Sequence, residues 1–461
     1  MIAAHEIVER ALAASTTRGC IVIVRSVSVA NLRWARTTLT TNGETQAQSV
    51  TVVALADVGS GVGAGSVTVN APDSVALVDA VRRAESRAVE SGPAEDAADL
   101  VAGVEAPSDW ADGPVVATSS SFDHLAPDLG AIFAAARGEG IEHFGYAEQT
   151  ISTIHLGTSS GVRLRYVAPE ARLELTAKSH ERTRSTWVGT SGHSFDDIDL
   201  EEIDAELRQG LRWQERRIEV EPGRHTALLS SSAVADLMLH LYYASVGRDA
   251  HEGSSVWSAP AGGTRIGETV ADPRVSLVSD PAFPGIECVP FLEVSASSGF
   301  ASVFDNGIGV PAVDWIRDGV LTSLITSRAT ATETGLPFRP PVENLRMEVA
   351  GCSGTLDELV ARTDEGLLVT CTWYNRTVDA QTALVTGLTR DGVYVVRDGE
   401  VVGAATNFRW NDSPVSILGR VVDAGSPHRT LGREMADYFP RTEMAPLLVR
   451  DFNFSTVSRA S

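Results

Sequence analysis

The chain has 461 residues, of which 43% are hydrophobic and 21% are charged, a composition typical of a globular protein of roughly two or three domains. A net charge of −22 argues against a nucleic-acid partner, because phosphates need clusters of Lys and Arg. No apolar run approaches the ~20 residues of a membrane-spanning helix, and the amino-terminal segment lacks an export-signal pattern. The four cysteines include no close pair, so we expect a soluble cytoplasmic protein with free thiols.

The first half of the chain alternates between helical and extended patterns. Apolar periodicity predicts helices over 2–14, 72–88, 127–137 and 199–213, with Val75, Val78, Val81 and Ala84 as the inward stripe of the second. β-rich runs at 20–27, 31–35, 49–55, 65–69 and between 140 and 177 predict an antiparallel sheet with one wet face.

Two segments of this half predict loops. The glycine run Gly59–Gly65 joins two strand-like runs, whereas a dinucleotide-binding loop must open onto a helix, so we predict a flexible hairpin. Residues 90–114 hold seven acidic residues and no basic residue, which predicts an exposed or partly ordered excursion.

Glu221–Arg224, which follows a charged stretch, is the expected domain boundary. After it the chain is rich in strands and turns, with helices predicted over 355–362, where Thr355 and Glu358 form a capping box, and over 415–422. We therefore predict an α+β fold. Residues 1–220 form an amino-terminal domain of helices on antiparallel sheet, and residues 221–461 form a large β-rich domain.

Ala227–Ser245 is the most informative stretch, because it predicts a strand end, a Ser-rich turn and an amphipathic helix. His240 lies in that helix, where a metallopeptidase could carry a ligand. A helical zinc site needs a second His on the same face and a carboxylate, but the neighbouring positions hold Leu241, Ala244 and Ser245. A packed, hydrogen-bonded histidine is therefore the favoured interpretation.

Other candidates for chemistry are weaker. His251 and Glu252 follow the helix in Gly/Ser-rich sequence. Together with Asp249 they could bind a metal or face a peptide or partner, although a solvated loop is the simpler interpretation. The cysteines have no nearby histidine. Gly157–Gly161 lacks the strand-to-helix context of a serine nucleophile.

Several motifs in the second half resemble the TldD/PmbA (TldE) family of peptidases, and their order and spacing together are fairly specific. The amino-terminal half resembles the family more loosely. The matching segments are Leu239-His240, Gly253-Ser-Ser-Val-Trp-Ser, Gly262-Gly-Thr-Arg-Ile-Gly-Glu268, Phe304-Asp-Asn-Gly-Ile-Gly-Val-Pro, Arg317-Asp-Gly-Val-Leu, Ser327-Arg-Ala-Thr-Ala, Pro341-Val-Glu-Asn-Leu-Arg-Met, Gly366-Leu-Leu-Val-Thr and Arg397-Asp-Gly-Glu-Val-Val-Gly-Ala-Ala-Thr406.

The resemblance implies a two-chain enzyme. A TldD-type subunit carries zinc on a His-Glu-x-x-x-His helix with a Cys ligand near its carboxyl terminus, and a PmbA/TldE-type subunit lacks these ligands. Here His240 matches the first His, Leu241 stands in place of the Glu and Ser245 in place of the second His. No Cys follows Cys371. The chain thus resembles the PmbA/TldE type, with no catalytic or metal-binding residue of its own.

The resemblance further implies a cytoplasmic heterodimer whose TldD-type partner holds the zinc and which cleaves unfolded or leader peptides. This chain would supply part of the cavity wall and of the peptide-gripping surface. Two alternatives remain: a metallopeptidase in its own right, with an atypical metal site drawn from His240, His251, Glu252 and a distant Cys, and a homo-oligomeric peptide-binding protein without a TldD partner.

Overall fold

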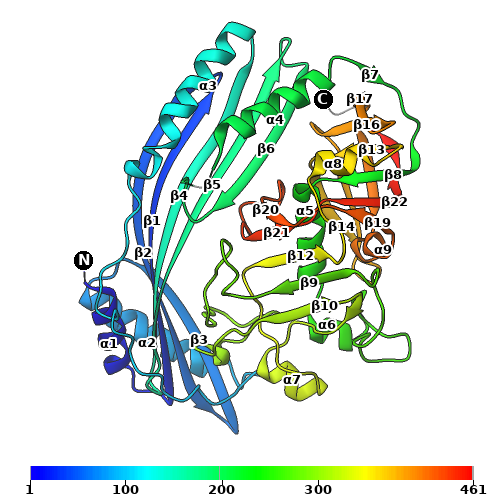
Figure 1. Ribbon diagram of the computed structural model, residues 1–461. Helices are drawn as coiled ribbons and strands as arrows, with labels where there is room; N and C mark the ends of the chain where they lie inside the picture. Colours follow the sequence, from blue (N-terminus) through cyan, green and yellow to red (C-terminus); the bar gives the residue numbers. More distant parts are fainter. Residues whose placement is uncertain (1, 197, 459–461) are drawn as a thin grey trace.

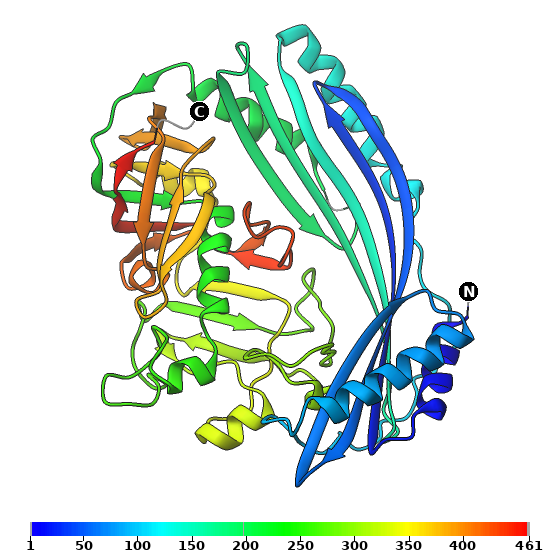
Figure 2. The same cartoon turned by 180° about the vertical axis from the view of Figure 1, so that it is seen from behind.

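The computed structural model describes residues 2–196 and 198–458. Its helices and strands form an α+β fold, as the sequence predicts. A long, curved antiparallel sheet from the first half of the chain stands as a wall along one side of the molecule, and the second half lies against one of its faces (Figures 1 and 2). Within the described residues, no helix is long and apolar enough to cross a membrane.

The amino-terminal sheet has six strands in the order β3-β2-β1-β4-β5-β6, and every neighbouring pair is antiparallel. The strands are longer than the sequence predicts, because the segments expected at 20–27 and 31–35 form one strand of 17 residues. The bounds are β1 (Gly19–Ala35), β2 (Thr38–Val58), β3 (Gly61–Asn70), β4 (Glu142–Thr158), β5 (Arg163–Ser179) and β6 (Arg184–Gly192).

Side chains alternate between the two faces of this sheet, as in any strand. On β1, Val22 packs beneath α1 and α2 at one end, while Trp34 packs beneath α3 and α4 at the other. Ile21 and Ile23, on the opposite face, pack with the second half of the chain. The covering helices are α1 (Ala4–Ala14), α2 (Ser74–Glu90), α3 (Leu125–Glu139) and α4 (Leu200–Trp213).

The prediction of a flexible glycine hairpin at 59–65 is only partly correct. The turn is confined to Gly59 and Ser60, and the remaining glycines belong to β3. A Cβ on Gly63 would lie 2.1 Å from the carbonyl oxygen of Ala88, and one on Gly65 would lie 2.2 Å from the nitrogen of Ala88. These glycines therefore let α2 approach the sheet backbone.

The inward stripe predicted for α2 is partly wrong. Val75 is 79% exposed and Val78 is 44% exposed, whereas Val81 and Ala84 are fully buried as expected. The helix instead packs Ala80, Ala84 and Ala88 against the glycines of β3. Small residues on both surfaces permit this close packing. The buried face consists of Leu77, Ala80, Val81, Ala84, Glu85 and Ala88.

The acidic excursion at 90–114 begins at the last residue of α2, its residues 91–114 form no helix or strand, and hydrogen bonds tie it to the sheet. The Ala94 N–H donates to the carbonyl of Val62 at 2.8 Å, and the Arg163 N–H donates to that of Val104 at 3.0 Å. A short 3-10 helix, η1 (Ser119–Phe122), follows it.

The second half contains three sheets around a central helix, α5 (Ser231–Tyr243), which packs against β8, β20, β21 and α9. The seven-stranded sheet comprises β7 (Arg217–Ile218), β8 (Gly223–Leu229), β13 (Glu365–Val369), β16 (Val393–Arg397), β17 (Glu400–Ala405), β19 (Val421–Ala424) and β22 (Leu447–Phe454). The six-stranded sheet comprises β9 (Val275–Ser279), β10 (Val313–Arg317), β11 (Val320–Leu321), β12 (Leu345–Val349), β20 (His428–Thr430) and β21 (Thr442–Met444). The four-stranded sheet comprises β14 (Trp373–Asp379), β15 (Leu384–Leu388), β18 (Phe408–Asp412) and β23 (Thr456–Val457).

Short helices lie between these strands. The predicted helix at 355–362 is confirmed as α8, together with its capping box of Thr355 and Glu358. The helix predicted over 415–422 ends at Leu418, and strand β19 begins at Val421. The remaining helices are α6 (Gly247–His251), η2 (Val303–Asp305), α7 (Arg328–Thr334), α8 (Leu356–Ala361) and α9 (Pro414–Leu418).

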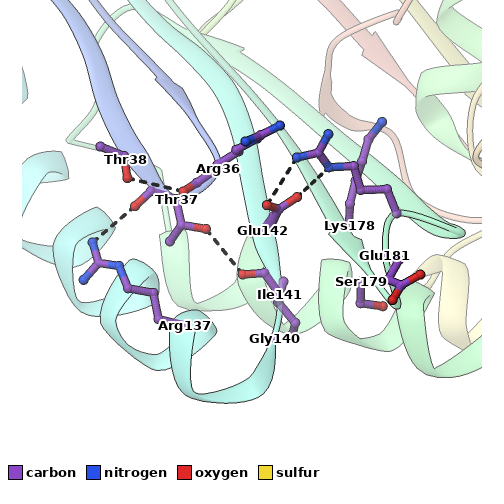
Figure 3. Close-up of a pocket in the computed structure, with 11 residues that line it drawn as sticks. Arg36, Thr37, Thr38, Arg137, Gly140, Ile141, Glu142, Lys178, Ser179 and Glu181 are labelled. Atoms are coloured by element: carbon purple, nitrogen blue, oxygen red, sulfur yellow. Dashed lines mark hydrogen bonds and ion pairs between the residues drawn. The ribbon is translucent and has the colours of Figure 1, made fainter.

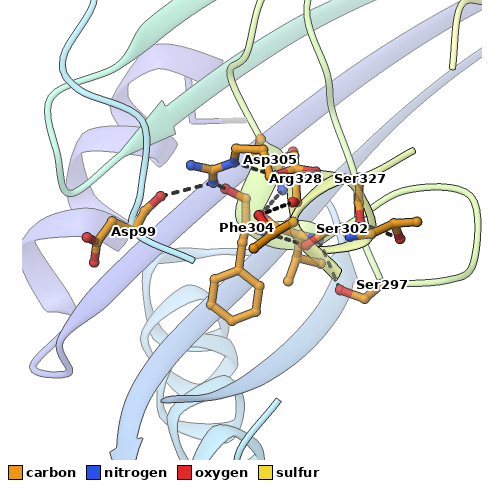
Figure 4. Close-up of polar contacts among 11 residues, drawn as sticks. Asp99, Ser297, Ser302, Phe304, Asp305, Ser327 and Arg328 are labelled. Carbon is orange, nitrogen blue, oxygen red and sulfur yellow. Dashed lines mark hydrogen bonds and ion pairs between the residues drawn. The ribbon is translucent and has the colours of Figure 1, made fainter. Parts of the chain in front are cut away.

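Arg328 connects the second half of the chain to the acidic excursion (Figure 4). Arg328 donates from Nε to Asp305 at 2.6 Å and from its backbone N–H to the same carboxylate at 3.1 Å. Its Nη2 also donates to the backbone carbonyl of Asp99 at 2.9 Å. The pair with Asp305, which is 1% exposed, fixes Arg328, and the hydrogen bond to Asp99 links the excursion to it.

Candidate functional site

The central helix α5 is buried on nearly all sides, as expected for a helix in the middle of a domain. Ser230 caps its amino terminus by accepting a hydrogen bond from the Ala233 N–H at 3.2 Å. The predicted strand, Ser-rich turn and helix are therefore confirmed. The apolar surface extends well beyond the one stripe that the sequence predicts.

Leu241 and Ser245 both face the interior. Leu241 is 1% exposed and belongs to the main hydrophobic core. The Ser245 hydroxyl donates to the Leu241 carbonyl at 2.9 Å and accepts from the indole N–H of Trp257 at 3.1 Å. These two positions hold an aliphatic side chain and a hydroxyl that already has two partners.

His240 lies half-buried on the side of α5 that faces Glu434 and Arg376. Burial lowers the pKa of its imidazole, the Glu434 carboxylate opposes this shift, and Arg376 adds to it. Its Nε2 is buried and makes no hydrogen bond with another described residue. The environment therefore favours the neutral imidazole.

Asp236 lies one turn before His240 and is the polar residue of α5 that sequence reasoning missed. It is 0% exposed, and it accepts hydrogen bonds from the Glu434 N–H and the Met435 N–H, each at 3.1 Å. Burial raises the pKa of its carboxyl to about 7, although these hydrogen bonds oppose the shift. Asp236 thus holds the loop at 433–438 against the helix. Its signal in the sequence is a lone acid inside an apolar run.

The same loop borders a hollow of about 630 Å³, here called the central cleft, between the amino-terminal sheet and the second half of the chain. Its wall combines aromatic rings with charges of both signs. The lining residues are Arg33, Trp34, Phe144, Gly145, Tyr146, Glu148, Arg172, Glu174, Thr176, Trp187, Trp373, Arg433 and Asp437.

Arg433 connects the two sides of the central cleft. Its guanidinium lies 5.3 Å from the ring centre of Trp187 on β6 and 4.4 Å from that of Trp373 on β14. It also donates to the Asp391 carboxylate at 3.1 Å and to the Cys371 sulfur at 3.2 Å. Two cation–π contacts and an ion pair therefore hold this cation in place.

The cysteines have the environments of structural thiols. Burial raises the pKa of Cys20 and of Cys288 to about 12. Burial also raises the pKa of Cys371, although the neighbouring Arg433 opposes that shift. A thiol must ionise to act as a nucleophile or metal ligand, so these three are poor candidates for either role.

The structure does not join His251 and Glu252 to a site. His251 ends α6, and both side chains are exposed without a hydrogen bond to another described residue. Across residues 2–196 and 198–458, no three His, Cys, Asp or Glu side chains come together as a metal site requires.

Comparisons with known proteins place this arrangement in context. The PmbA/TldA metallopeptidase C-terminal domain matches residues 222–456. No curated protein sequence is significantly similar to the chain.

Solved structures with the same fold cover nearly the whole chain. TldE from Thermococcus kodakarensis has a TM-score of 0.76 and 14% identity, over 97% of this chain and 98% of that one. A proposed modulator of a DNA gyrase from Thermotoga maritima has a TM-score of 0.75 and 16% identity, over 97% and 99%. A similarly described protein from Bacteroides thetaiotaomicron has a TM-score of 0.75 and 15% identity, over 98% of both chains.

Proposed function

This chain belongs to the PmbA/TldD family, and we propose that it acts as the non-catalytic, TldE-type subunit of a two-chain metallopeptidase. The observation that carries the proposal is the surroundings of α5. The helix keeps His240, but Leu241 fills the hydrophobic core and Ser245 is hydrogen-bonded to Trp257.

These residues do not fit a zinc ion. Catalytic zinc needs three protein ligands and a group that accepts a proton from the bound water. His240 offers one imidazole nitrogen, Leu241 offers no donor atom, and the Ser245 hydroxyl is already engaged at 2.9 Å and 3.1 Å. In this proposal the zinc and the hydrolytic step belong to a TldD-type partner, and the subunit itself holds no cofactor.

The contribution of this chain would be to bind part of the peptide substrate. The central cleft offers aromatic faces to an unfolded or leader peptide. β14, the terminal strand of its sheet, borders the cleft with Trp373 and carries Tyr374, which is 53% exposed. An extended peptide can add to such an edge through main-chain hydrogen bonds, and neighbouring pockets then select its side chains.

The test is co-expression with the TldD-type protein of the same genome, followed by a cleavage assay on an unfolded peptide. We expect co-purification and cleavage only when both chains are present. Replacing the motif Glu of the partner by Gln should abolish cleavage, whereas His240→Ala in this chain should leave it unchanged.

The alternatives give different results in the same assay. Cleavage by this chain alone, with stoichiometric zinc that is lost in His240→Ala, would establish an atypical metallopeptidase instead. Peptide binding by a self-associated chain that forms no complex with the TldD-type protein would establish a homo-oligomeric binding protein.

A further inference from the structure

A second hollow, of about 820 Å³, lies at the far end of the amino-terminal sheet and is here called the tip pocket (Figure 3). Three connections that are distant in sequence meet there: the β1–β2 turn, the α3–β4 junction and the β5–β6 turn. The lining residues are Arg36, Thr37, Thr38, Arg137, Gly140, Ile141, Glu142, Lys178, Ser179, Glu181 and Arg182.

The charge of the tip pocket is opposite to that of the chain. The whole protein carries a net charge of −22, yet this wall holds four cationic side chains and only two acidic ones, Glu142 and Glu181. One of the cations, Lys178, is the only lysine among the 461 residues. The pocket is therefore a local positive site on an acidic molecule, which attracts anions.

Two of the four cations already have partners. Arg182 binds the Glu142 carboxylate through two nitrogens, at 2.6 and 3.3 Å. Arg137 donates to the Thr37 carbonyl at 3.2 Å. Arg182 therefore engages both oxygens of Glu142.

Arg36 and Lys178 are the remaining two, and neither forms an ion pair with another residue in the part of the chain that the structure describes, although the Lys178 ammonium lies 5.7 Å from the ring centre of Phe144. Figure 3 shows both side chains extending past Glu142 toward the same side. The pKa of Glu142 is lowered first by its hydrogen bond from Arg182, and further by Arg36 and Lys178. The two unpaired cations therefore lie near one carboxylate that is already engaged.

The backbone around the tip pocket is held in an unusual conformation. Arg36 and Thr37 have φ angles of 52° and 59°, where two-residue hairpins normally carry Asn-Gly. His180, Glu181 and Arg182 in the second turn have φ angles of 49°, 55° and 69°. A β-branched residue rarely adopts positive φ, and such strain persists only where its surroundings impose it.

Thr37 is fixed in this conformation from several directions. Its N–H donates to the His143 carbonyl at 2.9 Å, and its hydroxyl donates to the Ile141 carbonyl at 3.3 Å while it accepts from the His143 N–H at 3.0 Å. Arg137 binds the Thr37 carbonyl. The turn that carries Arg36 is thus pre-organised, which lowers the entropy lost on binding a ligand.

We propose that the tip pocket binds the phosphate group of a small ligand through Arg36 and Lys178. A phosphate monoester carries close to two negative charges at neutral pH, which matches the two unpaired cations, and Arg and Lys are the usual phosphate-binding side chains. A hollow of about 820 Å³ is in the size range of sites for small organic ligands. The phosphate could be free or part of a mononucleotide. This site is independent of the proposed peptidase role.

Calorimetric titration of the intact chain with inorganic phosphate, adenosine monophosphate and adenosine tests the proposal. We expect at least one phosphate-bearing probe to bind and adenosine alone not to bind. Arg36→Gln and Lys178→Gln should each weaken binding by about tenfold, the effect of losing one charge-assisted hydrogen bond. Arg216→Gln, which removes one exposed positive charge elsewhere, is the matched control and should change nothing.

The single lysine gives a second readout that does not depend on calorimetry. Acetylation of Lys178 in the wild-type chain, followed by peptide mass spectrometry, should slow when the bound probe is present. Equal binding of free phosphate and the nucleotide identifies the phosphate as the whole ligand, and tighter binding of the nucleotide identifies a mononucleotide. Absence of binding by both probes, or binding that both pocket variants retain, would overturn the proposal.

Discussion

The central cleft and the tip pocket are hollows of comparable size on one sheet, with volumes of about 630 and 820 Å³. Both are lined by several arginines and glutamates. In the central cleft, Arg433 is paired with Asp391 and stacked on two tryptophans, and Arg172 is paired with Glu174 and Asp437. In the tip pocket, Arg36 and Lys178 form no ion pair with another described residue, and the Lys178 ammonium lies 5.7 Å from the ring centre of Phe144.

The difference shows that the pairing of charges is more informative than their number. A cation that is buried with its partner contributes to the fold, and removing it leaves the partner unpaired. An exposed cation without an ion-pair partner contributes little to stability, and Arg36 is such a cation in a turn with positive φ. Mutations in the two regions should therefore separate effects on stability from effects on binding.

Substitution of Leu241 in the core around α5 should give the largest loss of stability. Leu241→Glu places a carboxyl where the native side chain is 1% exposed in the core, and we expect it to lower the free energy of unfolding by about 5 kcal/mol. Leu241→Met should lower it by less than about 1.5 kcal/mol, because volume and polarity are preserved. Urea denaturation measures both. A small loss in Leu241→Glu would mean that the side chain at position 241 can reach water without unfolding the helix.

Asp236 should make stability depend on pH. Its pKa is raised to about 7 by burial, above the unfolded value near 3.9, so the folded state binds this proton more tightly. The stabilisation is complete below about pH 4 and is lost as pH rises toward 7, by up to about 4 kcal/mol.

Asp236→Asn, which does not titrate, provides the reference for this effect. Unfolding free energies of both chains, measured from pH 4 to 8, should show the wild type losing stability relative to the variant as pH rises. A constant difference across this range would contradict the raised pKa.

Arg433 tests the pairing in the central cleft. Arg433→Leu removes the ion pair with Asp391 and the contacts with Trp187 and Trp373, and we expect a loss of about 3 kcal/mol. Arg433→Lys keeps the charge but not the planar fork, so its loss should be intermediate. Denaturation followed by tryptophan fluorescence reports both stability and the change around the two rings. An unchanged stability would mean that the paired cation is dispensable for the fold.

The sequence predicts the elements that depend on local signals. The cap at Asp199, the capping box at Thr355 and the helix after Ser230 all lie where their residue types place them. The length of β2 was not predictable, because its residues at 38–47 are mostly exposed and polar and lack the alternation of a half-buried strand. The face of α2 was also missed, because it depends on glycines in a different element.

The sites depend on contacts between distant segments, which periodicity does not reveal. The tip pocket joins residues near 36, 140 and 180, and its one signal in the sequence is that Lys178 is the only lysine. The interpretation of His240 from sequence rests on its neighbours Leu241, Ala244 and Ser245. The sequence contains Asp236, but its hydrogen bonds to residues 434 and 435 follow from the tertiary fold.

The smallest expected effect on stability is at the tip pocket. Arg36→Gln and Lys178→Gln, alone or together, should change the free energy of unfolding by less than about 0.5 kcal/mol. Neither native side chain takes part in an ion pair with another described residue. Any loss in the double variant should be larger at low salt, since Arg36 and Lys178 both attract the Glu142 carboxylate, and it should shrink as salt screens that attraction. Urea denaturation at two ionic strengths measures this. A loss as large as that of Arg433→Leu would show that the two cations hold the hairpin tips together. The cations of both hollows would then serve the stability of the fold.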